Sequence, residues 1–238
     1  MRILGLIVAR SGSKSVPNKN MKILAGKPLL EYTIDSAIAS QCFQDLIFSS
    51  DSKEYADFAL SKGVSVPFLR PGNLAQDSTP TIEVVIHALV QMKSLGKNYD
   101  AVCLLQPTHP FRERGSIDKA IKQFIQLGAD SLISVLPVPH EWNPHWILEP
   151  NEDGYLKLAT GEEEIIQHRQ DLPPAFFRDG SIYITKTEVI LQSHSLYGGK
   201  ISYIQNNPKY YVNIDTEQDW NEAVKKLKEI GSLICCVA

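Results

Sequence analysis

The feature that most constrains the fold of this 238-residue chain is an alternation of short apolar runs with helical segments over its first 136 residues. The runs are continuously apolar, which indicates strands buried on both faces. Strands alternating with helices predict a mostly parallel sheet with helices on both sides, a three-layer α/β fold. The segments expected as strands are 3–8, 45–49, 64–69, 101–105 and 131–136, and those expected as helices are 28–38, 53–62, 80–90 and 116–127.

Residues 137–178 interrupt this alternation. They hold six prolines, two tryptophans and three histidines, and only short alternating pieces such as 155–158 suggest small antiparallel strands. An irregular excursion of roughly 40 residues is uncommon in a compact domain unless it serves as a lid, a binding loop or an oligomerisation arm. We therefore expect one α/β domain, formed by 1–136 and 179–238, with an insertion at 137–178.

The chain after the insertion returns to regular structure. Segments 180–185, 202–204 and 211–215 are expected as strands. Thr216-Glu-Gln-Asp219 is a capping box, which predicts a final helix that runs to about Ile230.

A basic loop follows the first apolar run. It contains Arg10, Lys14 and Lys19, with Gly12 and several serines between them. Gly12 lets the backbone approach a ligand, and backbone N–H groups in such a loop can form an anion site. Three cations suit a polyphosphate, and the alternative is a solvated basic turn.

Other polar residues also follow directly on expected strands, namely 49–51, Arg70 and Gln106. In open parallel sheets, ligands bind at the carboxyl ends of the strands. We expect these residues to converge with the basic loop on one crevice.

A phosphate site of this kind also needs a carboxylate for the accompanying cation. Asp215, at the end of an expected strand, is the best candidate for Mg²⁺, and Asn213 on the same strand face offers an amide oxygen. The alternative is that Asp215 only begins the last helix.

Composition narrows the class of protein. The net charge of −3 gives no sign of a general nucleic-acid or membrane binder. We find neither a run of about 20 apolar residues nor a signal peptide, so we expect a cytoplasmic protein. The four cysteines, which include the adjacent Cys235 and Cys236, lack metal-site spacing. These residues together predict a cytoplasmic α/β enzyme that handles a phosphorylated ligand, with Mg²⁺.

Six motifs in order resemble the acylneuraminate cytidylyltransferases, the CMP-sialic acid synthetases and their relatives. The resemblance spans nearly the whole chain, and six motifs in one order are far more specific than one. The matching segments are Ala-Arg-Ser-Gly-Ser-Lys at 9–14 with Lys-Asn at 19–20, Leu-Arg-Pro at 69–71 with Leu-Ala-Gln-Asp at 74–77, Leu-Leu-Gln-Pro-Thr-His-Pro at 104–110, Arg-Gln-Asp-Leu-Pro at 169–173, Gly-Ser-Ile-Tyr-Ile at 180–184 and Ile-Asp-Thr-Glu at 214–217.

The resemblance implies a nucleotide-diphospho-sugar-transferase type of fold and a reaction between CTP and a nine-carbon 2-keto sugar acid. It also implies Mg²⁺, a homodimer, and an insertion that acts as a dimerisation arm and reaches the neighbour's site. By resemblance the nucleotide is held by Ala9, Arg10, Ser11, Lys14, Lys19, Asn20, Arg70 and Thr81, the sugar by Gln106, Arg169, Phe176, Phe177 and Tyr183, and the metal by Asp215 and Asn213, with Arg10, Lys19 and Asp215 catalytic.

Two departures from the family pattern leave the substrate open. Asn213-Ile214-Asp215 stands where these enzymes commonly have two aspartates, and a lysine that some relatives carry early in the arm is not evident. Sialic, legionaminic or pseudaminic acid would fit equally well. The alternatives are a cytidylyltransferase for another acid sugar such as Kdo and a non-catalytic nucleotide-binding relative.

Overall fold

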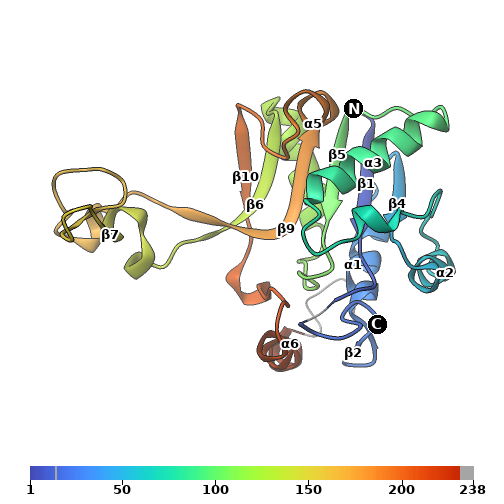
Figure 1. The fold of residues 1–238 in the computed structure, drawn as a ribbon, viewed down its shortest axis with the longest axis horizontal. Helices are drawn as coiled ribbons and strands as arrows, with labels where there is room; N and C mark the ends of the chain where they lie inside the picture. The colour runs from blue at the N-terminus through green and yellow to red at the C-terminus, as the bar shows by residue number, and fades with distance from the viewer. Residues whose placement is uncertain (14, 231–238) are drawn as a thin grey trace.

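The computed structural model describes residues 1–13 and 15–230, and its centre is a six-stranded sheet in the order β10-β6-β9-β5-β1-β4 (Figure 1). β9 is antiparallel to β5 and β6, and the other neighbours in the sheet are parallel. This confirms the expected mostly parallel sheet. The strands are β1 (Ile3–Val8), β4 (Asp45–Ser49), β5 (Ala101–Leu105), β6 (Ser131–Pro137), β9 (Phe176–Lys186) and β10 (Ile201–Gln205).

Helices cover both faces of the sheet, as the alternation predicts. In β1, Ile3 and Ile7 pack on the side of α1 (Leu29–Ile38), α2 (Lys53–Ser61) and α4 (Ser116–Leu127). Leu4 and Leu6 face the opposite side, where α3 (Thr81–Ser94) and α5 (Thr187–Ser193) pack. Because successive side chains of a strand point to opposite faces, one apolar run serves both cores.

The last helix, α6 (Glu217–Ile230), packs through Trp220 and Leu227 against the start of α1 and the small hairpin of β2 (Ile23–Leu24) and β3 (Lys27–Pro28). Its capping box is formed: the hydroxyl of Thr216 accepts from the N–H of Asp219 at 3.2 Å, and the Asp219 carboxylate accepts from the N–H of Thr216 at 2.7 Å. The cap fixes the point at which the preceding segment, 211–215, enters the helix.

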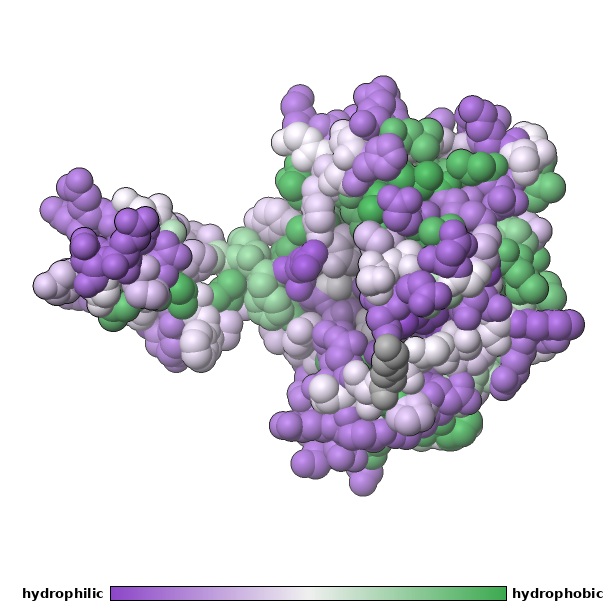
Figure 2. Space-filling view, viewed as in Figure 1, coloured by the Kyte–Doolittle hydropathy of each residue, from purple (hydrophilic) through white to green (hydrophobic). Residues whose placement is uncertain are grey.

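The insertion projects from the domain as a separate lobe on a narrow neck (Figures 1 and 2). The neck is the paired continuation of β6 and β9, which reaches Pro137 opposite Phe176. The lobe holds the antiparallel pair β7 (Leu148–Pro150) and β8 (Leu156–Leu158), as expected for alternating segments. The remaining part consists of 3₁₀ turns, at His140–Trp142, Pro144–Trp146 and Arg169–Asp171.

Two expected strands are wrong. Segment 64–69 lies beside β4 but forms only one bridge, Ile47 to Ser65, because Pro67 has no N–H to donate and cannot continue a ladder. Segment 211–215 is also irregular and is tied to the domain by the N–H of Ile214, which donates to the carbonyl of Thr108 at 2.9 Å.

The 3₁₀ turns of the insertion were not predicted. Outside the insertion, the described residues contain three more short helical elements that were not predicted: the seven-residue α5 and the 3₁₀ turns Gly72–Leu74 and Pro208–Tyr210. Within the described ranges, no helix is long and apolar enough to cross a membrane.

Candidate functional site

A cleft of about 750 Å³ opens at the carboxyl ends of β1 and β5. β9 enters the sheet at the same edge, since it runs antiparallel to β5 and contributes residues 178–180 and Tyr183 to the lining. Ten of the predicted site residues line this cleft although they come from six distant parts of the sequence: Ala9, Arg10, Lys19, Asn20, Arg70, Thr81, Gln106, Tyr183, Asn213 and Asp215.

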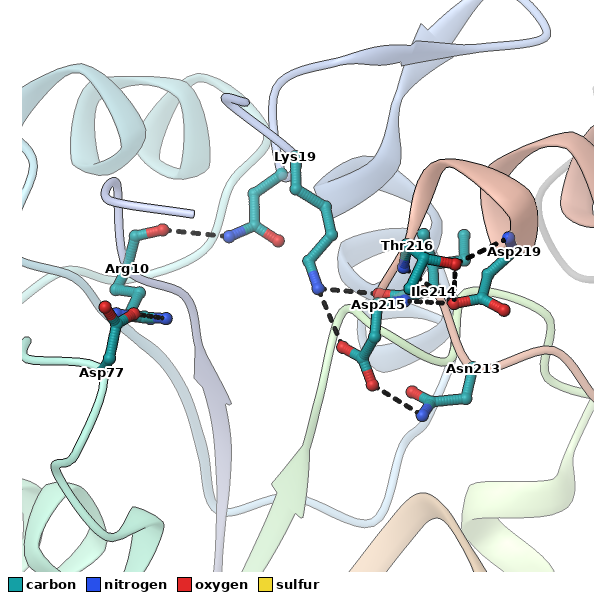
Figure 3. A network of polar contacts seen from close by, with 9 residues as sticks. Arg10, Lys19, Asp77, Asn213, Ile214, Asp215, Thr216 and Asp219 are labelled. Carbon is teal, nitrogen blue, oxygen red and sulfur yellow. Dashed lines mark hydrogen bonds and ion pairs between the residues drawn. The ribbon is translucent and has the colours of Figure 1, made fainter. Parts of the chain in front are cut away.

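Lys19 and Asp215 form the first charged pair of the cleft (Figure 3). The ammonium of Lys19 donates to Asp215 Oδ1 at 3.1 Å and to the carbonyl of Ile214 at 2.7 Å, and the Asn213 amide donates to Asp215 Oδ2 at 2.7 Å. The Lys19 side chain is 12% exposed and that of Asp215 is 58% exposed. The carboxylate is therefore held in place and still reachable from the cleft.

Asn213 and Asp215 lie side by side even though their segment is not a strand. The bond from Ile214 to Thr108 and the capping box of α6 hold this segment at Ile214 and just after Asp215. Side chains two residues apart are consequently presented together to the cleft.

Arg10 forms the second charged pair, with Asp77, which the sequence interpretation assigned no role (Figure 3). Asp77 comes from the loop before α3, where the Gln76 amide donates to the carbonyl of Gly72 at 2.8 Å and orders the turn. The buried Asn20 amide donates to the carbonyl of Arg10 at 3.1 Å and fixes the backbone of the basic loop. Arg10 thus already binds an anionic oxygen group, the carboxylate of Asp77.

Arg70 is buried beneath the basic loop. Its guanidinium donates to the carbonyl of Ala9 at 3.1 Å and lies 3.7 Å from the carboxylate of Asp51. Burial lowers the pKa of Arg70, but a guanidinium starts so high that it stays charged. Ser11 points to the same carboxylate, with its hydroxyl 2.7 Å and its N–H 3.1 Å from Asp51, and it does not line the cleft. Ser11 therefore anchors the loop, and Lys14 lies outside the described residues.

The predicted sugar-binding residues separate into two groups. Gln106 and Tyr183 line the cleft, and burial raises the pKa of Tyr183 to about 12, so its hydroxyl stays protonated. Phe176 and Phe177 lie at the neck of the insertion, where their rings pack on Tyr203 and Tyr211 at centroid distances of 4.9 and 5.7 Å. Arg169 lies in the insertion, so the cleft of one chain does not bring these three residues to Gln106.

Two buried polar residues of the cleft were missed by sequence reasoning. Asp179 accepts from the N–H of Ser181 at 2.9 Å and from the amide of Asn206 at 2.5 Å. His109 is 8% exposed, and its ring stacks on Tyr211 at 5.9 Å. Burial, with the charge of Arg112 nearby, lowers the pKa of His109 to about 4. The position of His109 just past β5 was the signal in the sequence that could have identified it.

Gly180 packs directly against the ring of His109. Its φ of +80° is in the left-handed region, and a Cβ there would lie 2.4 Å from His109 Nε2. Gly180→Ala should combine a backbone cost of about 1 kcal/mol with a clash of about 1–3 kcal/mol. Gly63→Ala is the matched control, because Gly63 has φ +85° and nothing within 4 Å of such a Cβ. Urea denaturation should show the larger loss for Gly180→Ala; equal losses would contradict the packing of His109.

The donor set of the cleft fits a divalent cation that a nucleotide helps to hold. Among residues 1–13 and 15–230, no group of three or more His, Cys, Asp or Glu side chains could hold a metal alone. One reachable carboxylate, Asp215, with an adjacent amide is however suited to Mg²⁺, which usually takes one or two carboxylates together with phosphates and water.

Comparison with known proteins assigns the chain to a family. The sequence profile of a family described as Cytidylyltransferase matches residues 4–233. The CMP-N,N'-diacetyllegionaminic acid synthase of Legionella pneumophila is 36% identical over 97% of this chain and 98% of its own length. The pseudaminic acid cytidylyltransferase of Campylobacter jejuni is 30% identical over 92% and 93%. The N-acylneuraminate cytidylyltransferase of Escherichia coli is 32% identical over 94% of this chain, which spans 51% of that protein.

A solved structure agrees in fold. The CMP:2-keto-3-deoxy-manno-octonic acid synthetase complexed with CTP superposes with a TM-score of 0.71, covering 96% of this chain and 99% of that one, at 11% identity. The profile match over 4–233, the six ordered motifs and the two relatives of 30% identity or more over nearly their full length lead to one conclusion: the chain belongs to the cytidylyltransferase family.

Proposed function

We propose that this protein joins CTP to a nonulosonic, sialic-type acid and releases the CMP-sugar and pyrophosphate. The observation that carries the proposal is the 36% identity with a legionaminic acid synthase over nearly the full length of both chains. The cleft supports it, because Arg10 and Arg70 lie on the β1 side while Gln106 and Tyr183 lie on the β5–β9 side. A nucleotide and a sugar could thus approach from opposite sides. CTP is a cytoplasmic nucleotide, and we infer that the reaction occurs there.

In this proposal the cations of the cleft bind the triphosphate. Arg10 exchanges the carboxylate of Asp77 for phosphate oxygens, which a guanidinium fork matches well. Lys19 adds a point charge, and Arg70 with Asn20 holds the loop backbone in shape. Thr81, at the start of α3, contributes a hydroxyl to the nucleotide side.

The anomeric hydroxyl of the sugar attacks the α-phosphorus in line, and pyrophosphate leaves. Little covalent help is needed, so positioning and charge neutralisation supply most of the rate. Arg10 and Lys19 stabilise the negative charge that grows on the phosphates and leaving group. Asp215 and Asn213 would hold Mg²⁺, which supplies additional charge neutralisation and lowers the pKa of a hydroxyl bound to it.

We further propose that 137–178 is a dimerisation arm and that Arg169 completes the sugar site of a second copy. The projection of the lobe away from the domain supports this arrangement (Figure 1). So does the exposure of Phe176 and Phe177 at the neck, since both aromatic rings remain available for a neighbour.

Subunit complementation tests the arm. In the proposed dimer, each site combines Asp215 of one chain with Arg169 of the other. Arg169→Ala and Asp215→Ala should therefore each be inactive alone, because every site then lacks one of the two residues. Mixed after dissociation, they should regain about a quarter of wild-type activity, since half of the dimers are mixed and each mixed dimer has one intact site. Pyrophosphate release is the readout, and mixing each variant with itself is the control. If the mixture stays inactive while mixed dimers form, Arg169 does not act across subunits.

The function is tested with purified protein, CTP and Mg²⁺. Pyrophosphate release and the CMP-sugar are measured over a panel of N-acetylneuraminic, legionaminic, pseudaminic and Kdo acids. We expect turnover with at least one nine-carbon acid. Turnover with Kdo alone would show that the substrate is an acid sugar of another class. CTP binding without pyrophosphate release on any acid would indicate a non-catalytic relative.

A further inference from the structure

We infer that His109 is a sugar-binding residue of the cleft, whose imidazole hydrogen-bonds the acid sugar beside its attacking hydroxyl and so helps to determine which acid is accepted. The inference rests on the proposed function. It begins with the unused hydrogen-bonding capacity of one side chain. His109 is a buried polar residue, and no hydrogen bond joins either ring nitrogen to a residue that the structure describes. Buried polar groups in proteins are normally hydrogen-bonded.

Packing holds the ring of His109 on two sides. Tyr211 stacks against it at 27° between the ring planes, and the backbone of Gly180 lies directly against the edge that carries Nε2. The N–H of His109 donates to the carbonyl of Gln106 at 3.3 Å, which closes the turn after β5. A ring that is held this firmly, and that lines the cleft, is preorganised for a ligand.

The position of His109 indicates which ligand. Its loop begins at Gln106, on the sugar side of the cleft. The neighbouring Thr108 accepts the bond from Ile214 at 2.9 Å, which places the loop against the segment that carries Asp215. His109 therefore lies between the residue expected to face the sugar and the carboxylate expected to hold the metal. In the proposed reaction, this is where the anomeric carbon of the sugar must lie.

The chemistry of the ring suits a sugar better than a phosphate. With its pKa lowered to about 4 by burial, the imidazole is neutral at physiological pH. A neutral imidazole has one N–H donor and one acceptor. Because the Gly180 backbone lies against the edge that carries Nε2, Nδ1 is the ring atom left to bond a hydroxyl, carboxylate or amide of the sugar. It adds no positive charge to the side of the cleft that must bind Mg²⁺.

The other buried groups of the cleft have partners of their own. Asp179 is bonded to Ser181 and Asn206, and Arg70 to the carbonyl of Ala9. Arg112, beneath the loop, donates to the hydroxyl of Thr33 at 2.9 Å. Arg70 Nε also has no hydrogen-bond partner among the described residues, but the rest of its guanidinium is bonded to Ala9. His109 differs in that no hydrogen bond joins either ring nitrogen to a described residue, so its hydrogen-bonding capacity is left for substrate.

Three substitutions test the inference. His109→Phe keeps the ring, its stacking on Tyr211 and its contact with Gly180, and removes both ring nitrogens. His109→Asn and His109→Gln restore a donor and an acceptor near Nδ1 and Nε2, respectively. The measurements are the KM for the acid sugar, the KM for CTP, kcat for each acid of the panel, and the melting temperature.

We expect His109→Phe to raise the KM of the sugar about 10–100-fold, which corresponds to the loss of one or two hydrogen bonds from a desolvated site. The KM for CTP should change less than twofold. His109→Asn should recover part of the loss, and His109→Gln, whose amide lies near the Nε2 edge covered by Gly180, should recover less. A merely structural role would not separate the two substrates or permit this rescue.

Two results would overturn the inference in distinguishable ways. If wild type turns over an acid sugar, and folded His109→Phe has the same KM, kcat and preference among acids, His109 does not bind sugar and the proposed function stands. If wild type binds CTP and turns over none of the acids, the proposed function fails and this inference fails with it.

Discussion

Asp215→Asn is expected to lower kcat/KM for CTP-dependent pyrophosphate release by about 10²–10³-fold, with most of the loss in kcat. The change removes one negative charge and keeps the shape. Loss of a single preorganised electrostatic contact at a reacting centre typically costs this much. The Mg²⁺ needed for half-maximal rate should rise as well, because an amide ligand brings no charge. Titration of the rate with Mg²⁺ at saturating CTP measures both effects.

The fold should tolerate Asp215→Asn. Lys19 keeps its bond to the carbonyl of Ile214, and the new amide oxygen can still accept from Asn213. Glu217→Gln is the matched control, because Glu217 also pairs with a lysine, Lys22 at 2.8 Å, and lies two residues away on the exposed side of α6. This control should retain wild-type rates. Wild-type turnover by Asp215→Asn would remove Asp215 from the mechanism.

Arg10→Lys should reduce kcat/KM for CTP by about 10–100-fold although it conserves the charge. A guanidinium presents paired N–H donors to phosphate oxygens, whereas an ammonium acts as a point charge, and bonds to charged groups are worth about 1.5–3 kcal/mol each. The loss should appear in KM for CTP and in kcat. The KM of the sugar should change little, since Arg10 lies on the β1 side of the cleft.

Arg2→Lys is the control for Arg10→Lys. Arg2 also pairs with a carboxylate, Asp100 at 3.4 Å, but on an exposed surface where such pairs contribute little. It should leave both KM values unchanged. If Arg10→Lys behaves like Arg2→Lys, the guanidinium of Arg10 makes no paired contact with the triphosphate.

The architecture was largely predictable because it depends on periodicity. Continuous apolar runs give buried strands, and β4 and α4 begin and end where the pattern predicts. The failures have local causes. Pro67 interrupts an apolar segment that otherwise satisfies the criteria for a strand, and 211–215 is held by a single backbone bond to Thr108 instead of a ladder. The α5 helix is too short for its periodicity to be recognised.

The candidate site was predictable to the extent that strand ends converge. Arg10 and Gln106 lie near the carboxyl ends of β1 and β5, and this rule needs no side-chain geometry. Arg70 was placed by the same rule through segment 64–69, which does not form a strand, and it reaches the site through the bond of its N–H to the carbonyl of Ser50 at 2.8 Å, just past β4. The role of Asp77 could not be predicted in the same way, and for His109 the position just past β5 was evident in the sequence but its confinement was not. Asp77 meets Arg10 only because the loop before α3 folds back, and His109 is confined only because antiparallel β9 brings Gly180 against it. Those contacts depend on tertiary structure.

The sheet order also bears on how such an enzyme can diverge. In the proposed function the nucleotide side of the cleft lies at β1 and the sugar side at β5 and β9, so the two functions would meet at the boundary between β1 and β5. β9 is continuous with the insertion through Phe176, so the residues proposed to contact the sugar share one strand with the insertion. Selection on a new acid sugar can therefore act on one hairpin while the machinery for CTP is inherited unchanged.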